Sequence, residues 1–138
     1  MTGFRIPITV RSYELDALGH VNHAVYHQYA EVARMSGFAA AGCDWDGMSG
    51  DRVAPVLLST TVNFRSELRA NDQVEVTCRI KFGTGKTFDL EQLIIKADGT
   101  TAAEVSCIVG LMDLDARKLL TDPRAALEAR GFDPAKLA

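Results

Sequence analysis

The stretch Asp16-Ala17-Leu18-Gly19-His20-Val21-Asn22-His23-Ala24-Val25-Tyr26-His27 joins a segment of strand-like pattern to one of helical pattern. It contains all three histidines of the 138-residue chain. Asn22 is a good helix N-cap, so we expect a helix from residue 23 or 24 to about 41, with Gly42 as its stop. One wide face of this helix is small and apolar, which suits burial against a sheet. That face comprises Val25, Tyr26, Tyr29, Ala30, Val32, Ala33, Ser36 and Gly37.

Alternating apolar and polar residues predict strands around this helix. The predicted strands span residues 4–13, 53–67, 74–82, 86–97 and 101–113. Pro7 lacks an N–H and therefore places the first strand at an edge, whereas 101–113 is apolar on both faces and should be central. Asn71-Asp72 and Asp98-Gly99 are turn signals. We expect loops at 14–22 and 43–52, a turn at 114–118 and a short closing helix at 123–130.

The order of these elements predicts a single α+β domain over residues 1–138. It should hold an antiparallel sheet of about five strands, with one long helix covering a face. A hydrophobic content of 47% is enough for a full core. The three cysteines are odd in number and form no CxxC, which favours neither a disulfide framework nor a zinc site and indicates a reducing, cytoplasmic setting.

Charge and hydropathy exclude several kinds of partner. The net charge of −3 gives no basic field for nucleic acid. No stretch approaches the roughly 20 apolar residues of a membrane span, and the N-terminus has no signal-peptide pattern. An anionic ligand would need a local group of cations.

The junction at residues 16–27 also predicts chemistry. Backbone N–H groups at a helix start are unpaired and favour negative charge. A carboxylate just upstream can act on a carbonyl whose oxygen those groups hold, as acyl transfer requires. Asp16 is the candidate, as general base or nucleophile; the alternative is a loop Asp that caps a turn. Three close histidines also suggest a metal, but no second ligand-rich segment is evident, so we expect none.

The string from Val10 to Tyr26, followed by Tyr29, Glu31 and Arg34, resembles the start of hotdog-fold acyl-CoA thioesterases of the 4-hydroxybenzoyl-CoA thioesterase type. The segments 63–68, 71–76 and 109–113 extend the resemblance. It implies a sheet wrapped around the long helix, and subunits paired edge to edge as a homodimer or homotetramer. It also implies a catalytic Asp16 and a carbonyl-polarising His23 N–H. The Gly-His-Val-Asn form is closer to the members that act on fatty acyl-CoA than to the benzoyl-type members.

Further residues receive roles in this scheme. Gly19, His20 and Asn22 belong to the catalytic loop, although Asn22 fits a helix cap better. Tyr26 should be a core residue or a pocket wall. Glu31 is an alternative acid, but His27 and Arg34 at helical spacing favour a structural ion pair. Cationic side chains that could meet coenzyme A phosphates are Arg65, Arg69, Arg79, Lys81 and Lys86.

The predicted function is hydrolysis of an acyl-CoA thioester to a free acid and coenzyme A. No metal or cofactor is expected, since coenzyme A is part of the substrate. One alternative is another hotdog enzyme: a thioesterase for acyl carrier protein, or a hydratase that pairs Asp16 with His20 or His23. The other is a non-catalytic module that binds acyl-CoA.

Overall fold

A computed structural model describes residues 3–138, apart from the side chain of Trp45, so the first two residues of the predicted domain lie outside it. Its helical elements are η1 (Ser12–Glu14), α1 (His23–Ala40), α2 (Trp45–Gly50), α3 (Pro123–Glu128) and η2 (Pro134–Leu137). Its strands are β1 (Arg5–Thr9), β2 (Val53–Phe64), β3 (Gln73–Thr77), β4 (Arg79–Phe82), β5 (Thr87–Lys96), β6 (Thr101–Asp113) and β7 (Lys118–Leu119).

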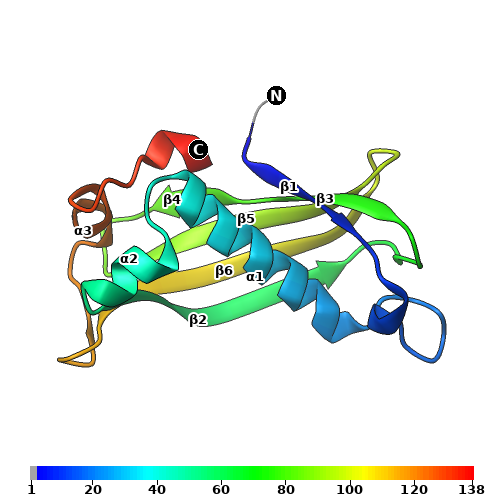
Figure 1. Cartoon of the computed structure of the whole chain (residues 1–138), viewed down its shortest axis with the longest axis horizontal. Coiled ribbons are helices and arrows are strands. Elements are labelled where there is room, and N and C mark those ends of the chain that lie inside the picture. Colours follow the sequence, from blue (N-terminus) through cyan, green and yellow to red (C-terminus); the bar gives the residue numbers. More distant parts are fainter. Residues whose placement is uncertain (1–2) are drawn as a thin grey trace.

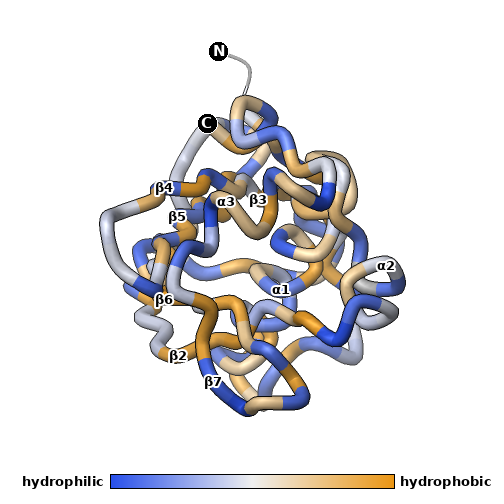
Figure 2. The backbone as a smooth tube through the Cα atoms, turned by 90° about the vertical axis from the view of Figure 1, so that its left-hand side faces the viewer, coloured by the Kyte–Doolittle hydropathy of each residue, from blue (hydrophilic) through white to orange (hydrophobic). Residues whose placement is uncertain are grey.

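The strands form one antiparallel sheet with the order β1-β3-β5-β6-β2, in which β4 also pairs with β5 and β7 with β6. The sheet lies behind α1, and α2 and α3 close one end (Figure 1). Seen end-on, the sheet curves around α1 (Figure 2). This is the arrangement that the sequence predicts. The edge position of β1 and the central position of β6 are confirmed.

Helix α1 begins where the cap residue predicts. The Asn22 side chain accepts a hydrogen bond from the Ala24 N–H at 2.9 Å, and Gly42, at a φ of +108°, follows the helix end. The predicted face is only partly right: Val32 is 49% exposed and Ser36 is half-buried. Helix periodicity turns these two positions away from the sheet, and Phe38 is buried instead.

Several predicted boundaries are wrong. The first strand ends at Thr9, not residue 13, and the chain turns into η1 so that Glu14 becomes buried. The predicted loop 43–52 contains α2, which Asp44 caps through the Gly47 N–H. The predicted strand 74–82 is interrupted at Cys78. There the Thr77 hydroxyl accepts a hydrogen bond from the Leu93 N–H at 2.8 Å, so a side chain replaces a backbone partner and the ladder breaks.

The core divides along α1. One cluster surrounds the first half of the helix and includes Tyr26, Tyr29 and Leu68. The other surrounds the second half of the helix and includes Phe38 of α1. Phe132, between α3 and η2, and Leu137 of η2 pack into this second cluster. In residues 3–138, no helix has the length and apolar character needed to cross a membrane.

Candidate functional site

The loop between η1 and α1 is held closed by its own backbone. Leu15 and Val21 form an antiparallel bridge. Inside it, the Asp16 N–H donates to the His20 carbonyl at 2.7 Å, and the Gly19 N–H donates to the Asp16 carbonyl at 3.1 Å. Gly19 has a φ of +80°, a conformation that glycine adopts without strain. The loop therefore has one defined shape, with Asp16 and His20 facing each other across it.

Asp16 is exposed and only half of its carboxylate is engaged. Its Oδ1 accepts the N–H groups of Leu18 at 2.9 Å and His20 at 3.3 Å, so the turn-capping role considered from the sequence is present. Its Oδ2 has no hydrogen-bond partner in the part of the chain that the structure describes. The first oxygen fixes the side chain in place, which leaves the second oxygen directed and available.

The first turn of α1 supplies one free donor. The Asn22 side chain accepts a hydrogen bond from the Ala24 N–H, and the Asn22 carbonyl accepts one from the Val25 N–H at 2.9 Å. The His23 N–H has no hydrogen-bond partner within residues 3–138. An unpaired N–H at a helix start carries a partial positive charge and can bind an oxyanion. The cap therefore leaves His23 as the donor at the helix tip.

These groups share one open cleft of about 350 Å³. The cleft is lined by Asp16, His20, Val21, His23, Tyr26, Phe64, Arg65, Ser66 and Glu67. Tyr26 is buried and meets Phe64 edge to face, with the ring centroids 5.0 Å apart. Burial raises the pKa of the Tyr26 hydroxyl, so this group stays protonated and serves as a wall. The structure thus brings to one cleft five of the residues singled out from the sequence, namely Asp16, His20, His23, Tyr26 and Arg65, and their roles stay predictions.

Gly19 and Asn22 support the cleft without lining it. Lys86 lies far away in the same chain. It precedes Thr87, which pairs with Gly110, whereas Phe64 of the cleft pairs with Ala103. Seven residues along β6 correspond to roughly 23 Å. Within one chain, Lys86 therefore lies far from Asp16, and its contact with coenzyme A phosphates stays a prediction.

The other predicted cations are also mostly remote or engaged. Arg65 forms an ion pair with Glu104 at 2.8 Å, and Arg69 forms one with Glu67 at 2.8 Å. Arg79 and Lys81 lie on β4, opposite Glu91 and Asp89 of β5. Only Arg65 and Arg69 are close enough to the cleft to meet a ligand held there, and each would have to share its carboxylate partner.

Glu14 and Glu67 are two acids near the cleft whose positions are not predicted from the sequence. Glu14 is buried, and its Oε1 accepts the Tyr29 hydroxyl at 2.5 Å and the Arg11 N–H at 2.8 Å. The Glu14 carbonyl accepts the Asn22 N–H at 2.9 Å, so Glu14 supports the helix cap. Glu67 lines the cleft itself. Neither role has a local sequence signal, because the Glu14–Tyr29 contact and the place of Glu67 beside Asp16 each join segments distant in the chain.

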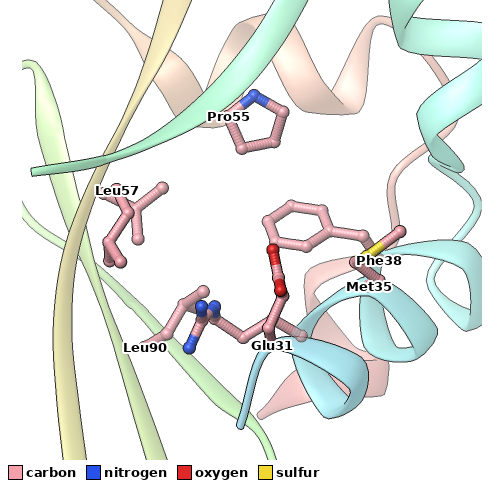
Figure 3. A pocket seen from close by; sticks show the side chains of 8 residues that line it. Glu31, Met35, Phe38, Pro55, Leu57 and Leu90 are labelled. Atoms are coloured by element: carbon pink, nitrogen blue, oxygen red, sulfur yellow. The ribbon is translucent and has the colours of Figure 1, made fainter. Parts of the chain in front are cut away.

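Glu31 lies elsewhere, in a cavity of about 150 Å³ between α1 and the sheet. Figure 3 shows its carboxylate at this cavity, beside Phe38 and below Pro55. Among residues 3–138, Glu31 forms no ion pair with His27 or Arg34, so that expectation is wrong. Arg34 instead donates to Gln92 at 3.1 Å, beneath the helix. Glu31 and Asp16 therefore do not share a pocket, and Glu31 lies away from the free helix N–H.

The histidines do not converge on one point. His20 is folded toward Glu67, while His23 and His27 are exposed on the first turns of α1. In the described part of the chain, no three His, Cys, Asp or Glu side chains gather as metal ligands would.

Comparisons with known proteins point to one family. The sequence model of the family described as "Thioesterase-like superfamily" matches residues 10–130. Over 114 residues the chain is 29% identical to the long-chain acyl-CoA thioesterase FadM of Escherichia coli strain K12, covering 82% of this chain and 86% of FadM. Over 112 residues it is 30% identical to the acyl-CoA thioester hydrolase YbgC of Escherichia coli O6:H1, covering 81% of this chain and 84% of YbgC.

Solved structures show the same fold. The crystal structure of YbaW, a probable thioesterase from Escherichia coli, superposes with a TM-score of 0.83 at 25% identity, over 98% of this chain and 99% of that one. A Staphylococcus aureus protein solved with CoA gives a TM-score of 0.85 at 19% identity, over 99% and 87% of the two chains. These likenesses confirm the hotdog fold predicted from the sequence.

Proposed function

Because the chain belongs to the thioesterase-like superfamily, we propose that it hydrolyses acyl-CoA thioesters to a free carboxylic acid and coenzyme A. It is a thioester hydrolase by family, and its relatives FadM and YbgC carry acyl-CoA activities in their names. One observation carries the proposal: a half-free Asp16 carboxylate and the unpaired His23 N–H line the same cleft.

The proposed reaction uses these two groups in sequence. The thioester oxygen accepts a hydrogen bond from the His23 N–H, which stabilises the negative charge that develops there. In one route, Asp16 Oδ2 takes a proton from a water molecule that attacks the carbonyl carbon. In the other route, Oδ2 attacks that carbon itself, and water then hydrolyses the resulting mixed anhydride to the free acid and the Asp16 carboxylate. The C–O bond forms, the C–S bond breaks and coenzyme A leaves as a thiolate. A thiolate is a good leaving group, so we propose no metal and no cofactor.

The other loop residues have supporting roles in this proposal. Gly19 permits the turn, Asn22 caps the helix so that the His23 N–H stays free, and His20 fixes the loop. Tyr26 and Arg65 line the approach of the substrate. The cavity beside Leu57 and Phe38 is lined by apolar side chains apart from Glu31 and Arg34, and we propose that its apolar part takes the acyl tail.

The test measures thiol release from acyl-CoAs of two to eighteen carbons, together with benzoyl-CoA and phenylacetyl-CoA. Asp16→Asn keeps an oxygen for the Leu18 and His20 N–H groups but loses the base, so activity should fall at least about a thousandfold. Glu75→Gln, on β3 and paired with Arg5 away from the cleft, is the matched control and should retain activity. The panel also identifies the acyl class.

The backbone donor is tested by His23→Pro. Proline is tolerated at the first helical position, and the Asn22 ψ of 138° suits a residue before proline. This variant deletes the N–H and should lose about 10²–10³ in kcat. His23→Ala keeps the N–H and should retain most of the activity. Equal activity of the two variants would contradict the donor role.

The remaining alternatives are distinct outcomes of the same assays. Much faster hydrolysis of acyl carrier protein than of acyl-CoA would indicate a carrier-protein thioesterase. Water addition to enoyl-CoA without thiol release would indicate a hydratase. Acyl-CoA binding without turnover, unaffected by Asp16→Asn, would indicate a binding module.

We propose a homodimer, or a homotetramer built from two dimers, joined through β2. This strand is 12 residues long, and within residues 3–138 it pairs with β6 alone, which leaves its other edge open there. Leu57, Leu58 and Phe64 on β2 are about half exposed. Long apolar edges promote pairing with another strand. Sedimentation of Leu57→Asp/Leu58→Asp beside the wild type should show a shift to monomer; a wild-type monomer would overturn the proposal.

We also propose a cytoplasmic location. Cys43, Cys78 and Cys107 are free and buried. Free thiols are typical of proteins in reducing compartments. Fractionation of the native host cells tests this directly.

A further inference from the structure

Glu67 follows β2 and lines the cleft opposite the Asp16 loop. We propose that Glu67 is a positioning residue: its carboxylate holds the Asp16 loop in its reactive shape by binding His20. This inference rests on the proposed function, since it concerns the same cleft and the same Asp16.

The contacts of Glu67 use both of its oxygens. Oε2 meets the His20 Nε2 at 2.5 Å. Oε1 accepts from the Arg69 Nε at 3.2 Å and Nη2 at 2.8 Å. Two donors from one guanidinium fix the direction of the carboxylate as well as its position. The Arg69 N–H in turn binds the Asp72 carboxylate at 2.9 Å, so this end is attached to the turn before β3.

His20 carries this constraint to Asp16. The His20 carbonyl accepts the Asp16 N–H at 2.7 Å, and the His20 N–H donates to Asp16 Oδ1 at 3.3 Å. The imidazole held by Glu67 thus belongs to the residue that orients the Asp16 carboxylate. One residue further on, the Val21 N–H donates to the carbonyl of Leu68, a fully buried residue. Residues 67 and 68 therefore bind the loop at two adjacent positions, His20 and Val21.

The charge of Glu67 suits this role better than it suits catalysis. Hydrogen bonding from Arg69 holds the pKa of the Glu67 carboxyl below its usual value, with smaller contributions from His20 and Lys96. An ionised carboxylate whose two oxygens are both occupied is a poor base for water. Asp16, in contrast, keeps one oxygen without a partner among residues 3–138. Of the two acids in the cleft, Asp16 therefore reacts and Glu67 positions the loop.

Three substitutions separate holding from proton transfer. Glu67→Gln keeps an acceptor for the His20 N–H without the charge, and should keep kcat within about threefold. Glu67→Ala removes the acceptor, and Glu67→Asp withdraws it by one methylene. Both should lower kcat about 10- to 100-fold, because a small displacement of a catalytic group has effects of this size. KM should change less than threefold.

Two further measurements keep the result specific. Glu75→Ala removes an equally exposed carboxylate, which pairs with Arg5 at 3.1 Å away from the cleft, and should leave kcat unchanged. In the double variant His20→Ala/Glu67→Ala, kcat should equal that of His20→Ala alone, because Glu67 acts through His20. Additive losses would instead overturn this route.

Other outcomes also overturn the inference. If Glu67→Gln is as inactive as Glu67→Ala, Glu67 transfers a proton. If Glu67→Ala raises KM at constant kcat, Glu67 contacts substrate. If Glu67→Ala has the same kcat as Glu75→Ala, the contact between Glu67 and His20 does not position Asp16. Failure of the proposed function is a different result, in which Asp16→Asn itself stays active.

Discussion

The hydrogen bond between Tyr29 and Glu14 allows a sharp test of what supports the helix cap. The Tyr29 side chain is 2% exposed, and its hydroxyl donates to the Glu14 carboxylate at 2.5 Å. Tyr29→Phe keeps the buried ring and removes only the oxygen. Glu14 still accepts the Arg11 N–H at 2.8 Å and the Arg11 Nη2 at 3.0 Å, so its charge is not left unpaired.

The expected loss follows from those contacts. A hydrogen bond to a charged group contributes about 1.5–3 kcal/mol to stability. Since Glu14 keeps two of its three partners, we expect about 2 kcal/mol for Tyr29→Phe, near the lower half of that range. With a urea slope of about 1.5 kcal/mol/M, the midpoint of unfolding should fall by about 1.3 M.

Urea unfolding followed by circular dichroism, at one fixed protein concentration, measures this shift. Tyr13→Phe is the matched control, because Tyr13 is 79% exposed. Its free energy of unfolding should change by less than about 0.5 kcal/mol. If the two variants unfold at the same urea concentration, the buried hydrogen bond does not contribute stability and the reasoning is wrong.

Two further predictions concern the helix start and a buried thiol. Asn22→Ala removes the acceptor of the Ala24 N–H and should cost about 1 kcal/mol by urea unfolding; Asn22→Ser, which restores an acceptor, should recover most of it. Burial raises the pKa of the Cys78 thiol to about 12. Since its pKa is lower in the unfolded chain, stability should fall as the pH rises from about 9 towards 12; Cys78→Ala should make this fall shallower, and an unchanged slope would contradict it.

Local patterns predicted those elements that depend on local chemistry. The Asn22 cap set the start of α1, and the apolar faces of 101–113 predicted a central β6. The errors arise where a distant residue decides. The break at Cys78 depends on a Thr77 side chain that meets Leu93 of another strand. The early end of β1 accompanies the burial of Glu14 against Tyr29.

The site shows the same division. Asp16, His20 and His23 lie within eight residues, so one loop could be expected to bring them together. Glu67 approaches that loop from 47 positions further along the chain, and only the fold reveals their contact. Lys86 was named as a possible contact of the coenzyme A phosphates, and the strand register places it far from the Asp16 cleft of its own chain.

The free donor at the tip of α1 belongs to the main chain, which has a consequence for how this site can evolve. Any residue other than proline supplies an N–H at position 23, so the side chain there is free to change. Under the proposed mechanism, variation at this position can then adjust contacts with different acyl groups while the oxyanion donor is preserved. The constraint falls instead on Asn22 and Gly19, whose backbone geometry keeps that N–H exposed.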